Sequence, residues 1–188
     1  DRGVDENHIA IPSLLAVSAV QQYLVRTKKR TAISIILESA EPRDVHHFAT
    51  LFGYGASAVN PYLAQDCIGE LIAGGALNKD YYAAVDAYNK AILDGVMRIA
   101  SKMGISSMQS YEGAQIFEAV GICKDVVDRY FTNTVSRVGG IGLQEINEAI
   151  VKASRRGPLK GIIAVTDQPN VSIDFNHDPH SSTFALDQ

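Results

Sequence analysis

The sequence predicts an α/β protein, in which a partial βα-barrel-like parallel unit with long helices is followed by a short antiparallel β-meander. Three observations support this fold class. Residues 31–64 read as strand, helix and strand, residues 81–103 carry apolar side chains at helical spacing, and residues 159–186 contain three short apolar or alternating segments. Helices that alternate with strands indicate parallel pairing, whereas strands joined by short loops pair antiparallel.

The first strand–helix–strand unit organises the rest of the chain. Arg30–Leu37 ends in the run AISIIL, which is typical of a strand buried on both faces. Glu41 and Pro42 are expected to open the helix, because proline fits a first turn and acidic groups favour the helix N-terminus. Gly53 ends the helix, and Ala56–Asn60 forms a second strand that should pair parallel with the first. The apolar face of this helix consists of Val45, Phe48, Ala49 and Phe52.

Further helices are predicted on either side of this unit. An apolar helix covers about Pro12–Thr27, and a shorter one covers Gln65–Ala73. Asn78 is the expected N-cap of the longest helix, which runs to Met103. A stripe on this helix is expected to pack against the core, and it consists of Tyr81, Val85, Tyr88, Ile92, Val96, Ile99 and Met103.

The second half of the chain is predicted to consist of shorter elements. Ile105–Ser110 forms a weak strand, and Ala114–Val120 and Lys124–Phe131 form short helices. A glycine-rich loop over residues 139–142 leads into a helix over Leu143–Ser154. The three strands of the meander are expected at Leu159–Thr166, Asn170–Phe175 and Ser181–Leu186.

The composition is that of an ordinary globular protein. The chain has 188 residues, 46% of them hydrophobic and 20% charged, which allows one core or two small ones. A net charge of −4 gives no basic excess for binding nucleic acid or a membrane surface. Cys67 and Cys123 lie far apart, so neither metal ligation nor a disulfide framework is expected, and a reducing cytoplasmic setting is the prediction.

Two glycine patterns are candidate nucleotide or phosphate sites. Residues 53–58 match G-x-G-x-x-A, but that pattern needs a strand before it and a helix after it, and here the order is reversed. Gly139, Gly140 and Gly142 precede a helix, where backbone amides can bind an anion, and Arg137 is near enough to assist. No strand is evident before this second loop, so an anion site and a simple turn both stay open.

No metal centre or serine nucleophile is predicted. His46 and His47 are adjacent in a helix and therefore point in different directions, while Asp44 and His47 can form a surface ion pair. The segment HDPH at residues 177–180 reads as a connecting loop. Ser13 lacks the G-x-S-x-G setting of a nucleophile elbow.

Four long motifs resemble the large subunit of glutamate synthase: DRGVDENHIAIPSLLAVSAV, ILESAEPRDVHHFATLFGYGASAVNPYLA, MRIASKMGISSMQSYEGAQIFEAVGI and DRYFTNTVSRVGGIGLQEI. The resemblance covers about residues 1–145 and implies the end of the central domain, which leads toward an FMN-binding synthase barrel. It implies a parent enzyme that hydrolyses glutamine, channels ammonia and reductively aminates 2-oxoglutarate with FMN and a 3Fe-4S cluster. The residues for that chemistry lie outside the matching stretch. Gln21, Gln22 and Tyr23 stand where family members usually carry histidines.

The last part resembles a different family. GPLKGI and VSIDFNHDPHSS are similar to the catalytic domain of glyceraldehyde-3-phosphate and erythrose-4-phosphate dehydrogenases, which implies a piece of antiparallel sheet without catalytic residues. The two resemblances meet within Gln144–Ala149. We therefore expect two regions, residues 1–145 and 146–188, and a chimeric or artificial sequence is one hypothesis.

The sequence leaves three functions open. The first is a non-catalytic structural fragment of a glutamate synthase large subunit. The second is a small-molecule or phosphate-binding partial barrel that uses the Gly139–Gly142 loop. The third is an FMN- or NAD-linked oxidoreductase. No catalytic motif is present, so no bound cofactor is expected. The expected partners are a second copy or other domains of the parent enzyme, and neither nucleic acid nor a membrane.

Overall fold

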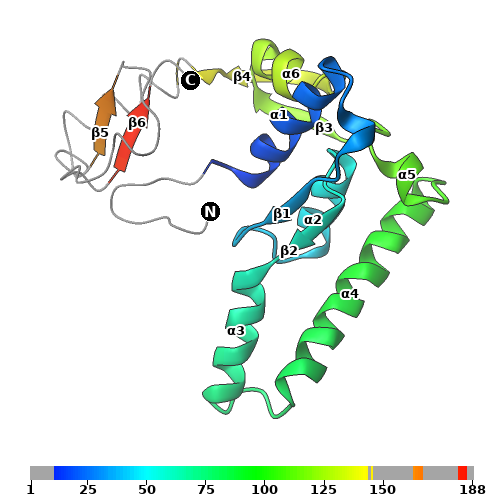
Figure 1. Ribbon diagram of the computed structural model, residues 1–188, viewed down its shortest axis with the longest axis vertical. Helices are drawn as coiled ribbons and strands as arrows, with labels where there is room; N and C mark the ends of the chain where they lie inside the picture. The colour runs from blue at the N-terminus through cyan, green and yellow to red at the C-terminus, as the bar shows by residue number, and fades with distance from the viewer. Residues whose placement is uncertain (1–10, 144, 146–162, 167–181, 186–188) are drawn as a thin grey trace.

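The computed structural model describes residues 11–143, 145, 163–166 and 182–185, and it confirms the α/β class (Figure 1). Helices and parallel strand pairs alternate along the chain. In chain order the elements are α1 (Ser13–Arg26), the 3-10 helix η1 (Arg30–Ala32), β1 (Ile36–Glu38), α2 (Val45–Gly53), β2 (Ala58–Asn60), α3 (Tyr62–Ala73), α4 (Tyr81–Lys102), α5 (Met108–Tyr111), β3 (Glu118–Ile122), α6 (Lys124–Tyr130), β4 (Val135–Ile141), β5 (Ile163–Thr166) and β6 (Ser182–Ala185).

The first strand pair is parallel, as predicted, but it is short and exposed. Ile36 lies opposite Ala58, and Glu38 lies opposite Asn60. The start of the predicted strand is instead the 3-10 turn η1. The prediction of burial on both faces is wrong, because Ile36 is 72% exposed. A sheet of only two strands leaves apolar side chains uncovered where no second layer of described residues packs against them.

Helix α2 begins three residues later than the sequence indicated. Its N-cap is Asp44, whose Oδ1 accepts hydrogen bonds from the amides of His46 (2.9 Å) and His47 (3.3 Å). Donation from the His47 amide holds the pKa of Asp44 below its ordinary value. Pro42 is fully buried before the helix rather than part of its first turn. The aspartate cap therefore decides where the helix starts.

The main core lies between α2 and α4. As predicted, the middle of the α4 stripe packs against the core, where it meets the apolar face of α2, whereas Tyr81 and Met103 at the ends of the stripe are exposed. Gly95 permits the close approach of the two helices, since a Cβ at that position would collide with the Val45 side chain. A second cluster joins α1 to α2 through Val17, Leu51 and Ala56. The buried residues of the main cluster are Phe48, Ala49, Ile92, Val96, Ala100 and Tyr111.

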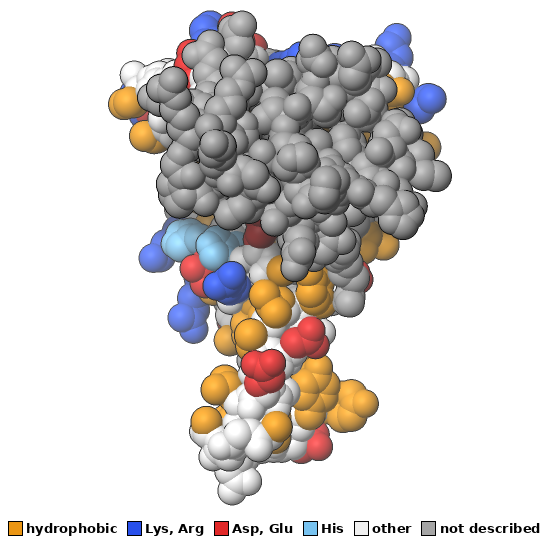
Figure 2. All heavy atoms as spheres, turned by 90° about the vertical axis from the view of Figure 1, so that its left-hand side faces the viewer, with side chains coloured by type: hydrophobic (Ala, Val, Ile, Leu, Met, Phe, Trp, Pro, Cys, Tyr) orange, Lys and Arg blue, Asp and Glu red, His pale blue; other side chains and the backbone are white. Residues whose placement is uncertain are grey.

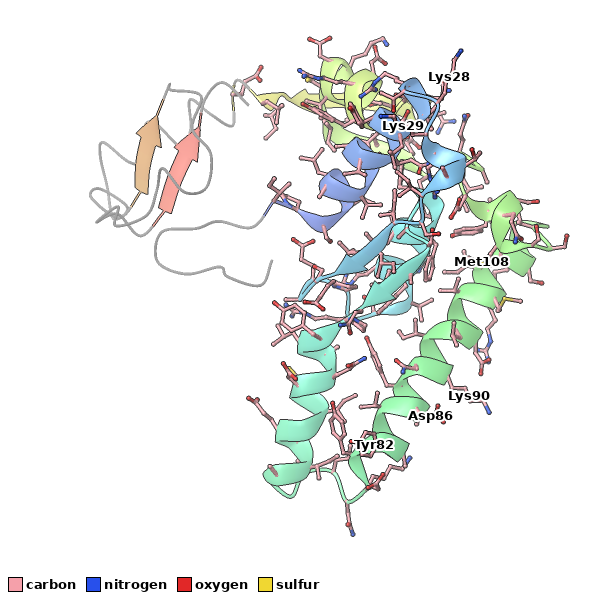
Figure 3. The ribbon with its side chains drawn as sticks, viewed as in Figure 1. Lys28, Lys29, Tyr82, Asp86, Lys90 and Met108 are labelled. Carbon is pink, nitrogen blue, oxygen red and sulfur yellow. The ribbon has the colours of Figure 1, made fainter. Side chains whose placement is uncertain are left out.

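Helices α3 and α4 form a hairpin that projects from this core (Figure 1). The N-cap of α4 is Asp80, whose Oδ2 accepts from the Ala83 amide (3.1 Å), and not the predicted Asn78. Tyr82 is 80% exposed, and Asp86 and Lys90 lie on the outer side of α4, away from α3 (Figure 3). Hydrophobic and acidic side chains are interspersed over this projecting part (Figure 2). Within the described ranges, no helix is both long and apolar enough to cross a membrane.

A second strand–helix–strand unit follows, and the sequence did not predict it. Strands β3 and β4 pair parallel across α6, so the helix predicted at Ala114–Val120 is wrong. The weak strand predicted at Ile105–Ser110 is also wrong, because Ser107 caps α5 by accepting from the Ser110 amide (3.3 Å). The predicted helix at Lys124–Phe131 is confirmed as α6.

The final strands differ from the predicted meander. Strands β5 and β6 pair parallel, with Ile163 opposite Ser182 and Thr166 opposite Ala185. Parallel neighbours cannot be joined by a hairpin, so the predicted antiparallel arrangement is wrong for this pair. The strand predicted at Asn170–Phe175 lies outside the described residues, as does the helix predicted at Leu143–Ser154 apart from Leu143 and Glu145.

Candidate functional site

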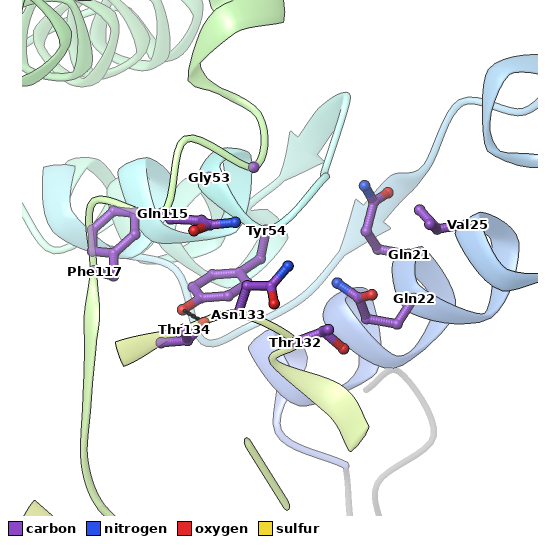
Figure 4. A pocket seen from close by; sticks show the side chains of 11 residues that line it. Gln21, Gln22, Val25, Gly53, Tyr54, Gln115, Phe117, Thr132, Asn133 and Thr134 are labelled. Atoms are coloured by element: carbon purple, nitrogen blue, oxygen red, sulfur yellow. Dashed lines mark hydrogen bonds between the residues drawn. The ribbon is translucent and has the colours of Figure 1, made fainter. Parts of the chain in front are cut away.

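A cavity of about 300 Å³ lies where α1, the end of α2 and the segments before β3 and after α6 meet (Figure 4). We call it the amide cavity, because carboxamide side chains dominate its polar lining. Among the described residues, its lining carries no charged side chain. The lining residues are Gln21, Gln22, Val25, Gly53, Tyr54, Gly113, Gln115, Phe117, Thr132, Asn133 and Thr134.

Tyr54 forms a fixed aromatic wall of the amide cavity. Its ring stacks with Phe117 at a centroid distance of 6.0 Å and meets the edge of Phe131 at 5.3 Å. Its hydroxyl lies 2.8 Å from Thr134 Oγ1, a hydrogen bond visible in Figure 4. A Cβ on Gly53 would lie 2.6 Å from the Phe117 ring, so a larger residue at this position would force that ring to shift.

The carboxamides of the cavity differ in how they are held. Gln21 Oε1 accepts a hydrogen bond from Arg30 Nε. The side chains of Gln22, Gln115 and Asn133 form no hydrogen bond with another described residue, and those of Gln115 and Asn133 are exposed to water. Each carboxamide offers two N–H donors and one carbonyl acceptor. The amide cavity therefore presents solvent-accessible donors and acceptors without net charge.

Two residues of the cavity lining adopt left-handed backbone conformations. Gln115 has φ 55° and Asn133 has φ 67°. Asparagine tolerates this region, whereas glutamine pays about 1 kcal/mol or more for it. Among the described residues the remaining non-glycine with positive φ is Lys28, directly after the C-cap of α1. Such strain persists where the surrounding structure holds the backbone in place.

Arg30 ties the elements around the cavity together. Besides the bond to Gln21, its guanidinium donates to the carbonyl oxygens of Ile33 (2.7 Å) and Gly55 (3.0 Å) and pairs with Glu112 (3.3 Å). These groups lie on α1 and in the segments that follow η1, α2 and α5. The side chain is 18% exposed, so one half-buried charge joins four segments.

A smaller cavity of about 190 Å³ contains a serine, a carboxylate and a histidine, but it is not arranged for nucleophilic catalysis. Ser13 Oγ donates to Glu41 Oε2 (2.5 Å), and the Ser13 amide donates to the same oxygen (2.9 Å). His47 Nδ1 accepts from the amides of Arg43 (3.1 Å) and Asp44 (3.5 Å). The histidine is thus committed to the helix cap, and Glu41 caps α1 from a distant segment.

The predicted anion loop has a different conformation from the one expected. Gly139 and Gly140 belong to strand β4, and Arg137 Nη1 pairs with Glu118 Oε2 at 2.8 Å. The Gly142 amide donates to Glu145 Oε2 (2.8 Å). A Cβ on Gly140 would overlap the backbone of Gly121, so this glycine serves the close approach of two strands. Anion binding by these four residues stays a prediction.

The other sequence patterns considered as possible sites have structural roles in the described part of the chain. The G-x-G-x-x-A stretch ends α2 and precedes β2, as the order of elements predicted. The predicted pair of Asp44 and His47 is present, with Nε2 and Oδ2 3.8 Å apart on the surface. In the part of the chain that the structure describes, no group of His, Cys, Asp and Glu could hold a metal ion. The HDPH segment lies outside that part.

Comparison with known proteins decides the family. The model of the glutamate synthase central domain matches residues 1–123. The chain belongs to the glutamate synthase central domain family. The glutamate synthase (NADPH) large chain of Bacillus subtilis is 55% identical over 156 residues, which are 83% of this chain and 10% of that protein. The glutamate synthase (NADH) of Schizosaccharomyces pombe is 41% identical over 148 residues, 78% of this chain and 7% of that protein.

The central domain relatives are much longer than this chain. A further relative, the glutamate synthase (NADPH) large chain of Azospirillum brasilense, is 40% identical over 166 residues, 88% of this chain and 11% of that protein. The chain thus spans about a tenth of the length of the curated relatives it matches. The C-terminal domain model of glyceraldehyde 3-phosphate dehydrogenase matches residues 131–188, which agrees with the second resemblance.

Sequence reasoning did not identify the amide cavity. Its lining comes from positions between 21 and 134, which no local motif brings together. One signal was available, because Gln21 and Gln22 are the positions at which the sequence was expected to depart from the pattern of the glutamate synthase resemblance. The other two carboxamides of the lining come from Gln115 and Asn133. Gln115 lies in the segment wrongly predicted as a helix, and Asn133 lies where no helix or strand was predicted.

Proposed function

We propose that this chain is a non-catalytic structural segment of a glutamate synthase large chain, which couples the amidase and synthase parts of the parent enzyme and helps to wall its ammonia path. The observation that carries this proposal is the Arg30 network, in which one half-buried cation joins four segments. The Ser13–Glu41 pair is used in the same way, to join α1 to the segment before α2. Polar groups in these positions hold elements together.

The uncharged lining of the amide cavity supports a place beside the ammonia path. Neutral ammonia is a small hydrogen-bond donor and acceptor. Carboxamides and hydroxyls can form hydrogen bonds with it, and these bonds are weaker than the one between a carboxylate and an ammonium ion. Charged groups near the cavity are already paired, as Arg30 is with Glu112.

The cofactors of the parent family do not fit the residues present here. A cluster held by three cysteines cannot be built from Cys67 on α3 and Cys123 before α6, the two cysteines of the chain. The glycine pattern expected to meet a phosphate is strand β4 over residues 139–141. We therefore derive no redox step for this chain.

A segment exchange tests the scaffold role. The matching stretch of the Bacillus subtilis large chain is replaced by residues 1–145 of this chain, and glutamine hydrolysis and glutamate formation are both measured. We expect the two rates to stay coupled. A hybrid that binds flavin and hydrolyses glutamine but forms no glutamate would contradict the proposal. The same hybrid carrying Arg30→Lys should lose coupling, and Arg98→Lys, an exposed arginine on α4, is its control.

We also propose that residues 146–188 form a separate region joined to the scaffold segment as a fusion. The dehydrogenase-type match over residues 131–188 supports this proposal. Limited proteolysis should cut near residues 144–149 and release a fragment containing residues 1–143. A natural genomic reading frame that encodes the whole chain without interruption would overturn the idea that the junction is artificial.

A further inference from the structure

The unused amides of the amide cavity point to a ligand. Gln22 is half-buried, and its carboxamide shares the cavity with those of Gln115 and Asn133, which lie around Tyr54 in Figure 4. Gln115 and Asn133 are exposed and Gln22 is half-buried, so water hydrogen-bonds these amides in the free chain, and a ligand that enters the cavity must replace that water with its own donors and acceptors. This observation is independent of the scaffold role proposed above.

We propose that the amide cavity binds a small, uncharged, planar molecule that carries a primary carboxamide or a lactam edge. Such an edge places an N–H donor beside a C=O acceptor, and a protein carboxamide pairs with both at once. A charged ligand would meet no opposite charge on the described lining, and transfer of an unpaired charge out of water is unfavourable.

The aromatic wall selects the shape of the ligand. Tyr54 is held by Thr134 through its hydroxyl and by Phe117 and Phe131 through its ring, so it does not need to be ordered on binding. Planar ligands stack on such a ring. The volume of about 300 Å³ lies at the lower end of ligand cavities and fits a single-ring molecule.

The backbone conformation at the cavity supports a specific binding site. Gln115 is held at φ 55° although a left-handed conformation is unfavourable for glutamine, and this places its carboxamide on the lining. Asn133 is likewise left-handed on the opposite segment. The backbone that carries both side chains is thus defined before any ligand arrives, whereas the side chains themselves are exposed to solvent.

Benzamide is the probe that tests the proposal on the 188-residue chain. Its binding is measured by ligand-observed NMR, with benzoate and acetophenone as controls of matched shape. We expect a Kd of about 1–10 mM for benzamide, which is ordinary for a ligand of nine heavy atoms. Benzoate should bind at least about tenfold more weakly because it is charged, and acetophenone about three- to tenfold more weakly because it lacks the N–H donors.

Two variants localise the binding. Asn133→Gly removes one carboxamide and leaves a residue that accepts φ 67° without strain, so folding is preserved. Gln22→Ala removes a second one from α1, and each change should weaken benzamide about three- to tenfold. Asn89→Ala, which removes an exposed carboxamide on α4, is the control and should change nothing. Equal binding of benzoate, unchanged affinity in both cavity variants, or no binding at about 20 mM benzamide would overturn the proposal.

Discussion

Tyr111 provides a direct test of the packing described above. The side chain is completely buried in the main cluster, which also contains Phe48 and Val96, and its hydroxyl has no hydrogen-bond partner among the described residues. A buried hydroxyl without a partner costs about 1–3 kcal/mol. Tyr111→Phe keeps the ring and removes the oxygen. We therefore expect the free energy of unfolding to rise by about 1 kcal/mol, which corresponds to about 2–4 °C in Tm for a chain of this size.

The same residue predicts how stability depends on alkaline pH. Burial raises the pKa of Tyr111 above its ordinary value of 10.0. Above pH 10 the unfolded chain loses this proton first, so the native state binds more protons and the free energy of unfolding falls as the pH rises. This contribution to stability is fully present below pH 10 and is lost as the pH approaches the pKa of the folded state. Tyr111→Phe should make the alkaline decline less steep.

Tyr88→Phe is the matched control. The Tyr88 hydroxyl donates to the Arg43 carbonyl oxygen (3.0 Å), so its removal should lower the free energy of unfolding by about 1 kcal/mol. Burial, with a smaller effect of Asp44, also raises the pKa of Tyr88, so both variants should weaken the alkaline decline. Urea unfolding at neutral pH and above pH 10 measures both effects. If Tyr111→Phe destabilised the chain as Tyr88→Phe does, the reasoning about the buried hydroxyl would be refuted.

Three further predictions concern charge, close packing and association. Arg30→Lys should lower the free energy of unfolding by about 2 kcal/mol, because an ammonium group cannot replace the hydrogen bonds of the planar guanidinium group. A similar loss of stability in Arg98→Lys would contradict this, because it would show a general effect of losing an arginine. Gly140→Ala should lower the free energy of unfolding by more than about 2 kcal/mol, because the new Cβ would overlap the backbone of the facing strand. Gly139→Ala should be nearly neutral, because a Cβ there meets no other atom. Equal changes in Tm for the two variants would contradict this prediction. The open edges of the β1–β2 pair should lead to self-association that Ile36→Asp reduces, and a strictly monomeric wild-type chain in light scattering would count against this pairing.

The helices could be predicted from the sequence because their signals are local. The apolar residues at helical spacing in α2 and α4 pack against each other, and Phe48, Ala49 and Ile92 belong to one buried cluster. Start positions were less certain, because a helix takes the best available cap. Asp80 lies two residues from Asn78 and forms the cap in the structure.

The second strand–helix–strand unit could not be predicted in the same way. Its first strand, β3, carries an interior glycine with φ 78°, Gly121, which weakens any local strand signal. What holds β3 in place is the partner strand β4, where Gly140 allows the two backbones to meet. A pairing that depends on two glycines about twenty residues apart becomes visible only after the chain has folded. The amide cavity, which lies beside this unit, was hidden for the same reason.

Helix α1 is attached to both strand–helix–strand units, and its position therefore determines the geometry of the amide cavity. Arg30 holds the C-terminal half of α1 to the first unit through Gln21, while Ser18 donates to the Tyr130 carbonyl oxygen on α6 in the second unit. Both attachments lie within one turn of Gln22, whose carboxamide lines the cavity. A change that loosens either attachment should therefore alter ligand binding without touching the lining. Arg30→Lys should then weaken benzamide binding as well as stability, whereas Tyr111→Phe, which changes a residue of the main cluster and not of the cavity lining, should change stability alone.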